Sequence, residues 1–193
     1  MGLAVGADLR GKVVHVHDGD TVTLVDTEGQ KHQVRLATID APELGQPYGQ
    51  ASRKHLQSLA QGRQAVVSGV RTDIHGRTLG KLMLKPAHCG QCDFTRDAGL
   101  AQLEAGYAWW YREFRQEQSL TDQGHYEYAE FDAKSRRIGL WLDDRPTPPW
   151  EWRKQNKVMA RSEHQAAPLR IRATGRKLHH APRARAHRRQ RLL

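Results

Sequence analysis

Acidic residues and two arginines gather in and around the ends of the predicted strands. Seven residues share this placement: Asp18, Asp20, Arg35, Asp40, Glu43, Asp73 and Arg77. Neighbouring carboxylates repel one another unless a cation lies between them, and a site rich in oxygen suits a hard ion such as Ca²⁺. Two arginines opposite such a site could stabilise the negative charge that develops as a phosphodiester is cleaved. Any one of these residues alone is better explained as a turn residue or a surface ion pair, so the interpretation depends on their convergence.

The elements that must bring them together follow from hydrophobic periodicity. Period-two alternation predicts strands, and a one-sided apolar stripe that ends at a glycine predicts a helix. In chain order the predicted strands and helix occupy 11–18, 21–27, 31–39, 49–62 (the helix), 64–72 and 78–84. The first three strands are joined by tight turns and should form an antiparallel meander. Five short strands with a helix after the third indicate an OB-fold barrel of the α+β class.

The second half of the chain reads as helical, over 97–110 and 121–141, which makes about three helices in all. Three aromatic residues of the later helix, Tyr126, Tyr128 and Phe131, are expected in the core, because aromatic residues near helical spacing usually pack inward.

Three motifs in this order, "DGDTV", "VRLATIDAPE" and "DIHGR", resemble the staphylococcal nuclease (thermonuclease) family. The similarity continues through "RRIGLW" to "PPWEWR" and covers residues 10–152. The resemblance implies an OB-fold, Ca²⁺-dependent nuclease that cuts DNA and RNA, preferably single-stranded or unstructured, and leaves 3′-phosphate ends. It also implies a monomer.

Carried over residue by residue, the resemblance implies two kinds of role. Asp20 and Asp40 would bind Ca²⁺ through their carboxylates, and Ala41 would contribute its backbone carbonyl. Glu43 matches the proposed general base that deprotonates or orients the attacking water.

The remaining matched residues would act around this centre. Arg35 and Arg77 match the two arginines that hold the scissile phosphate, and Asp18 would orient water and ligands. The chain departs from the family at Ile74-His75. These residues replace a Lys-Tyr pair that contacts a terminal phosphate in the family's prototype. Tyr111 is the candidate for the nucleotide pocket.

Cys89 and Cys92 are the only cysteines and form a CxxC pair. Such a pair can be a redox site, half of a zinc site or a small disulfide. Redox chemistry would need a helix N-terminus in a βαβ unit, and structural zinc needs four ligands where only His88 lies nearby. A disulfide that closes this short loop fits an oxidising compartment best.

Charge divides the chain at about residue 153. The sequence has a net charge of +10, yet 13 Lys/Arg and a single acid fall in 153–193, which leaves 18 basic and 20 acidic residues before that point. The C-terminal segment lacks apolar periodicity, so we expect a basic, disordered tail over 153–193 that attracts polyanions. The nuclease-like domain is then expected over 10–152.

The N-terminal segment 1–9 contains Val5-Gly6-Ala7, which has the small-residue pattern of a signal-peptidase site. It is either a plain N-terminus or the remnant of a signal peptide. The second alternative predicts a periplasmic or secreted protein, and the first a cytoplasmic one. No run approaches the roughly 18 apolar residues that span a bilayer, so no membrane association is expected.

Two other classes of function compete with the enzyme. A non-catalytic OB-fold module could bind protein or nucleic acid, and a single-strand binder could use stacking aromatics and a basic groove. The complete set of acids and arginines favours the enzyme, because in a simple binder Asp20, Asp40 and Glu43 would repel the nucleic-acid backbone.

Overall fold

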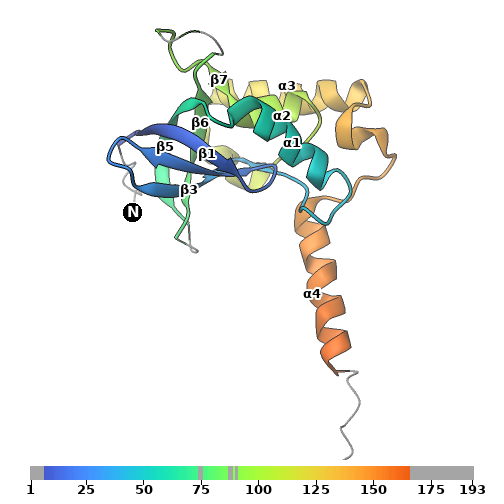
Figure 1. Ribbon diagram of the computed structural model, residues 1–193. Coiled ribbons are helices and arrows are strands. Elements are labelled where there is room, and N and C mark those ends of the chain that lie inside the picture. The colour runs from blue at the N-terminus through green and yellow to red at the C-terminus, as the bar shows by residue number, and fades with distance from the viewer. Residues whose placement is uncertain (1–6, 74–75, 87–88, 90, 166–193) are drawn as a thin grey trace, which may run out of the picture.

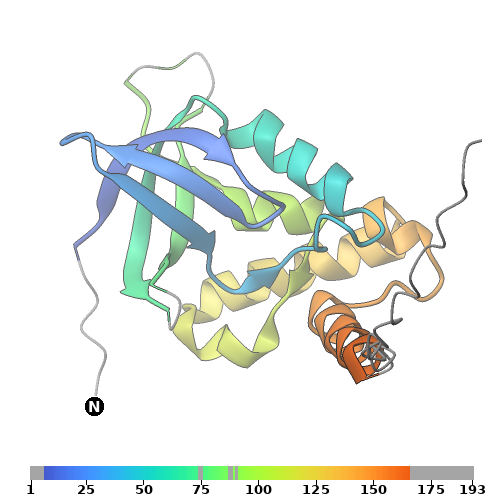
Figure 2. The same cartoon turned by 60° about the horizontal axis from the view of Figure 1, so that its bottom comes forward.

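The protein is described from a computed structural model that covers residues 7–73, 76–86, 89 and 91–165. A small barrel lies on one side, and α1, α2 and α3 lie on the other (Figures 1 and 2). The barrel strands are β1 (Leu9–Val16), β2 (Thr21–Asp26), β3 (Lys31–Leu36), β5 (Gln64–Thr72) and β6 (Thr78–Leu84). They pair in the order β3-β2-β1-β5-β6, and a parallel β3–β6 pairing closes the barrel. This is the predicted OB-fold architecture.

Shorter elements complete the domain. Strand β4 (Ile39–Asp40) pairs with β8 (Trp109–Trp110), and β7 (Arg96–Asp97) extends the edge at β6. The helices are α1 (Gly49–Ala60), α2 (Ala98–Glu104), α3 (Leu120–Ser135) and α4 (Pro149–Gln165), with 3₁₀ turns η1 (Arg112–Glu117) and η2 (Gly139–Leu142). None of the helices in the described residues is both long and apolar enough to traverse a bilayer.

The core fills the barrel and continues under the helices. Alternate residues of the strands point inward, among them Val22, Leu24 and Val34. Leu56 of α1 and Leu103 of α2 cap this interior and are fully buried. Because the alternation has a period of two, a slip of one residue would turn the apolar side chains outward, so the core fixes the register of the strands.

Three helical predictions need correction. The helix expected over 121–141 ends at Ser135, and Gly139 begins the separate 3₁₀ turn η2. The helix expected over 97–110 ends at Glu104, because Gly106 has φ +69° and turns the chain into β8. On α3, Tyr126 is buried, but Tyr128 and Phe131 are 69% and 65% exposed, so the expectation that all three enter the core was wrong. At about 100° per residue, the two exposed rings lie far around the helix from the face of Tyr126.

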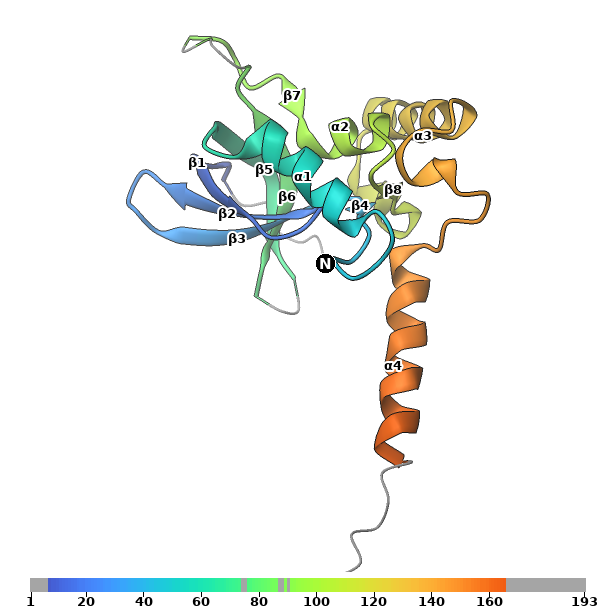
Figure 3. The ribbon, with the colours of Figure 1, turned by 45° about the vertical axis from the view of Figure 1, so that its right-hand side comes forward.

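The largest difference from expectation concerns the segment after Trp152. The structure continues there as α4 to Gln165, whereas a disordered tail was expected from residue 153. Pro149 opens the helix, a position where proline's missing N–H and fixed φ are favourable. Helix α4 projects away from the rest of the molecule (Figures 1 and 3). The rest of the expected tail, 166–193, and the segment 1–6 lie outside the described residues.

Cys89 and Cys92 are joined by a disulfide, with their Cα atoms 5.5 Å apart. This arrangement differs from the alternative of a zinc site, in which both thiolates would be ligands. His88 lies outside the described residues.

Candidate active site

The barrel itself brings the first site residues together. Thr21 pairs with Arg35 in the β2–β3 ladder, so Asp20, which precedes β2, lies beside that arginine. In the parallel closure Arg35 pairs with Leu79, two residues after Arg77. Closure of the barrel therefore places the β5–β6 hairpin at the mouth where β2 begins.

Asp40 reaches the same mouth through a turn and a short strand. Thr38 adopts a left-handed conformation with φ 65°, and its carbonyl accepts a hydrogen bond of 2.8 Å from the Tyr111 backbone N–H. Asp40 then pairs with Trp109 of β8. Glu130 of α3 is 1% exposed and accepts the backbone N–H of Trp110 at 3.1 Å, so a buried carboxylate fixes the strand that positions Asp40.

Arg35 bridges the two deepest carboxylates. Its Nη1 donates to Asp20 Oδ1 at 2.6 Å, and its Nη2 donates to Asp40 Oδ1 at 2.8 Å. Asp20 also accepts the hydroxyl of Thr21 and the backbone N–H of Ala41, each at 2.9 Å. Both carboxylates are almost fully buried, so each needs these partners to stay ionised.

The pKa shifts follow from this arrangement. Burial raises the pKa of Asp20, and Arg35 only partly opposes that shift. Burial alone would lower the pKa of Arg35, but the charges of Asp20 and Asp40 raise it above its ordinary value. Arg35 is therefore a permanent cation between two buried acids.

A second arginine, Arg153 of α4, contacts both Asp40 and Glu43. Its Nη2 donates to Asp40 Oδ2 at 2.7 Å, and its Nη1 donates to Asp40 Oδ1 at 3.2 Å and to Glu43 Oε1 at 2.8 Å. Burial would lower the pKa of Arg153, but Asp40 and Glu43 raise it. Sequence analysis missed this residue because it assigned 153–193 to a tail.

The loop that carries Glu43 is tied to the approach to α4. The Gln46 side chain accepts the Glu43 backbone N–H at 3.2 Å and donates to the Thr147 carbonyl at 2.5 Å. The Gln46 side chain therefore links the loop of Glu43 to the residues that precede Arg153.

Arg77 and Asp18 line the same cavity, which measures about 540 Å³. Its lining residues are Asp18, Asp20, Gln33, Arg35, Ala41, Pro42, Glu43, Arg77, Arg153 and Lys157. Asp73 holds Arg77, accepting its Nε at 2.8 Å and its backbone N–H at 2.9 Å. Asp18 accepts the backbone N–H of Asp20 at 3.0 Å, which fixes the turn before β2. The divergent Ile74-His75 pair lies outside the described residues.

Tyr111 lies next to this cavity rather than in its lining. Its ring packs against Trp150 and Phe114, with centroids 5.5 and 5.3 Å away. A hydrogen bond from its hydroxyl to Glu113, with burial as the second cause, raises the pKa of Tyr111 to about 12. Tyr111 also lines a neighbouring pocket of about 390 Å³ with Trp150 and Lys154 of α4.

The possible metal ligands at the cavity that holds Arg35 and Arg77 suit a hard divalent cation. Asp20 and Ala41 line this cavity and offer a carboxylate and a carbonyl, and the buried Asp40, hydrogen-bonded to Arg35 of the lining, adds a second carboxylate. These are the ligand types that Ca²⁺ prefers. In the described part of the chain, no three or more His, Cys, Asp or Glu side chains are already grouped as metal ligands. Instead, guanidinium groups of Arg35 and Arg153 occupy oxygens of the two buried acids.

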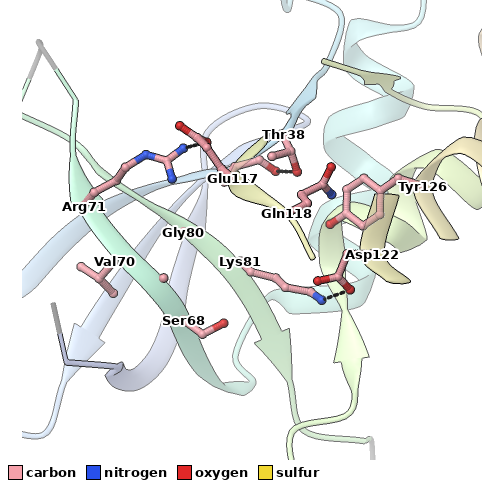
Figure 4. A pocket seen from close by; sticks show the side chains of 12 residues that line it. Thr38, Ser68, Val70, Arg71, Gly80, Lys81, Glu117, Gln118, Asp122 and Tyr126 are labelled. Carbon is pink, nitrogen blue, oxygen red and sulfur yellow. Dashed lines mark hydrogen bonds and ion pairs between the residues drawn. The ribbon is translucent and has the colours of Figure 1, made fainter. Parts of the chain in front are cut away.

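Another cavity, of about 380 Å³, lies between the β5–β6 strands and α3 (Figure 4). Its four charged lining residues form two ion pairs, Arg71 with Glu117 and Lys81 with Asp122. These charges cancel, whereas the lining of the cavity that holds Arg35 and Arg77 has four basic and three acidic side chains, so that cavity suits a phosphate better.

Comparisons with known proteins agree with this geometry. Residues 33–143 match the family model described as "Staphylococcal nuclease homologue". The chain is 37% identical over 151 residues to a micrococcal nuclease of Shigella flexneri, covering 78% of this chain and 84% of that protein. It is 33% identical over 147 residues to an uncharacterized endonuclease of Escherichia coli O157:H7, covering 76% and 86%.

A third relative, an uncharacterized endonuclease of Haemophilus influenzae, is 31% identical over 160 residues, covering 83% of this chain and 82% of that protein. The chain belongs to the staphylococcal nuclease family. Family membership and nuclease relatives that align over most of their length support a nuclease activity.

Proposed function

We propose that this protein is a Ca²⁺-dependent nuclease that hydrolyses phosphodiester bonds of both DNA and RNA and leaves 3′-phosphate ends. The observation that carries the proposal is a single cavity lined by Arg35, Arg77, Glu43 and the buried Asp20, with the buried Asp40 hydrogen-bonded to Arg35 of that lining. The substrates are single-stranded or unstructured nucleic acids, and the enzyme acts as a monomer.

Each side chain has a separate part in this chemistry. Arg35 and Arg77 bind the scissile phosphate and stabilise the charge on its oxygens as the bond order changes. Glu43, whose side chain is 43% exposed, is accessible to the water that attacks phosphorus and accepts the proton that this water loses. Asp18 orients water at the edge of the site.

The products follow from which bond breaks. The water oxygen bonds to phosphorus, the bond between phosphorus and the 5′-oxygen breaks, and that oxygen leaves as an alcohol after taking up a proton. Asp20, Asp40 and the Ala41 carbonyl would hold Ca²⁺, which when bound supplies further positive charge against the phosphate.

Digestion with and without metal tests the proposal. Single-stranded DNA and RNA are incubated with purified protein in Ca²⁺, in Mg²⁺ and in EGTA, with Glu43→Gln as the control for a contaminating nuclease. We expect cleavage of both substrates in Ca²⁺ and little in Mg²⁺, which requires tighter octahedral geometry and gives up water reluctantly. Full activity in EGTA would contradict the proposal.

The same protein is proposed to work in the periplasm or outside the cell. The Cys89–Cys92 disulfide supports this location, because such bonds persist in oxidising compartments. Mass spectrometry of non-reduced protein from cell fractions tests it, and two free thiols in protein taken directly from its native compartment would contradict it.

A further inference from the structure

Arg153 occupies the carboxylates that the proposed metal needs. All three of its hydrogen bonds in this region go to Asp40 and Glu43, and both carboxylate oxygens of Asp40 are engaged. A dication that binds Asp40 would lie against this guanidinium and repel it. The two cations therefore compete for the same oxygens.

The helix that carries Arg153 is anchored independently of these ion pairs. Trp150, one turn earlier, packs against Trp109 and Tyr111 with ring centroids 6.4 and 5.5 Å away. The Gln46–Thr147 hydrogen bond fixes the segment just before the helix. The guanidinium can thus leave the acids while its backbone stays in place beside the cavity.

A phosphate bound by the other two arginines would lie within the same cavity as this displaced guanidinium. Arg153, Arg35 and Arg77 line one cavity, and the Arg153 side chain is 38% exposed, so it is accessible to solvent and substrate. Lys157, four residues later on the same helical face, lines the cavity as well. Arginine suits this position because its planar fork can bind two phosphate oxygens at once.

We propose that Arg153 is a further phosphate-binding residue, which Asp40 and Glu43 hold until a divalent cation takes these carboxylates. The inference rests on the proposed function and adds an order of events to it. Metal binding frees the guanidinium, and the freed guanidinium binds substrate phosphate next to Arg35 and Arg77. Helix α4 thereby couples metal loading to substrate affinity.

Two titrations on the full chain test the proposal without measuring cleavage. The first is calorimetric titration of Ca²⁺ in the absence of nucleic acid. The second is titration of thymidine 5′-monophosphate, which has no phosphodiester to cleave, at saturating Ca²⁺. Arg153→Gln is compared with wild type, with Arg153→Lys, and with Arg136→Gln, which removes one positive charge from the exposed surface at the end of α3 and leaves Asp40 and Glu43 untouched.

The expected signature is a pair of opposite changes. Arg153→Gln should lower the Kd for Ca²⁺ by about 5-fold because a competing cation is gone, and raise the Kd for the nucleotide by about 10-fold because a charged hydrogen-bond donor is gone. Arg153→Lys should fall between wild type and Arg153→Gln in both titrations. Arg136→Gln should change each Kd by less than about 2-fold.

Other outcomes overturn the inference in distinguishable ways. Unchanged or weaker Ca²⁺ binding by Arg153→Gln would show that Arg153 does not compete with metal. Tighter Ca²⁺ binding with unchanged nucleotide affinity would remove the phosphate-binding role. In both cases Ca²⁺ still binds and the proposed nuclease stands, whereas absence of Ca²⁺ binding in every variant would refute both.

Discussion

Asp40 lies between two arginines that the fold supplies in different ways. Arg35 comes from a barrel strand, is 20% exposed and joins two carboxylates that are at most 3% exposed. Arg153 comes from a helix that leaves the domain, is 38% exposed and shares Asp40 with the half-exposed Glu43. The inner arginine is held between two buried carboxylates, while the outer one is more exposed to solvent and can exchange its partners more readily.

The comparison shows that one acid can be part of the permanent structure on one side and of an exchangeable contact on the other. Buried ion pairs are costly to break because the remaining charge stays without a partner. Half-exposed pairs are weak because water competes for both groups. The outer pair is therefore the one that metal or substrate can break at the smaller cost.

The largest effect should come from removing the inner arginine. In metal-free buffer, Arg35→Gln should lower the free energy of unfolding by about 3–5 kcal/mol. Among the described residues, Arg35 is the one ion-pair partner of Asp20 and one of two partners of Asp40. Arg153→Gln should cost less than about 1 kcal/mol, since Asp40 keeps Arg35. Urea denaturation measures both, with the exposed Arg136→Gln as control. Equal losses for Arg35 and Arg153 would contradict the distinction.

The next effect concerns catalysis at the mouth of the barrel. Arg77→Ala should lower kcat/KM by about 10²-fold or more, because a donor aimed at transition-state charge is lost. Arg96→Ala, which removes a surface pair with Glu104, is the matched control. Steady-state kinetics on single-stranded DNA measure the effect, and a loss no larger than that of the control would remove Arg77 from the mechanism.

The roles of Asp40 and Glu43 should separate when Ca²⁺ binding and turnover are measured independently. Asp40→Ala should weaken Ca²⁺ binding and activity together, whereas Glu43→Gln should leave most Ca²⁺ binding in place and lower turnover. Calorimetry and single-turnover kinetics distinguish them. Wild-type turnover by Glu43→Gln would mean that Glu43 does not activate water.

Truncation sharpens the comparison between α4 and the sequence that follows it. A chain that ends after Gln165 should keep wild-type turnover at saturating substrate and lose only salt-sensitive affinity, since basic segments gain affinity by releasing counterions. A chain that ends after Trp152 also lacks Arg153 and should bind the mononucleotide more weakly at any salt concentration. Superimposable salt titrations for the full chain and the Gln165 truncation would exclude 166–193 from substrate capture.

The smallest effect on activity is expected from removing the disulfide, which contacts neither Arg35 nor Arg153 in the described part of the chain. It closes a loop of sequence separation 3, so its loss should cost at most about 2 kcal/mol of stability. Cys89→Ser with Cys92→Ser should change kcat/KM by less than about 2-fold at 25 °C. A larger change in kcat/KM would show that the loop acts on the site.

Much of the site around Arg35 could be predicted from sequence because strand periodicity and turn residues are local patterns. Period-two alternation located the strands that carry Arg35, and the turns around Asp18 and Asp73 marked the barrel mouth. Arg153 was missed because its segment was judged by the net charge of 153–193 as a whole. The first turns of α4 were therefore grouped with the basic residues that follow. Pro149 and the adjacent Trp150 were the available signal, a favourable helix start with an aromatic anchor.

The exposed rings of α3 show where local pattern was insufficient. Tyr128 and Phe131 were expected inside because aromatic residues near helical spacing usually pack inward. The buried face of α3 is instead set by Tyr126, Ala129 and Ala133, spaced three and four residues apart. Which apolar stripe turns inward depends on how α2 and β8 pack against the helix. That packing is tertiary information.

The chemistry of the cut ends tests the central claim most directly. A 5′-labelled single-stranded DNA is digested in Ca²⁺ by wild type and by Glu43→Gln, and the products are run before and after phosphatase treatment that removes a 3′-phosphate. The account predicts wild-type products whose mobility shifts when the 3′-phosphate is removed, and a much slower reaction with Glu43→Gln. Products that already end in 3′-hydroxyls, formed at the same rate by both proteins, would contradict it.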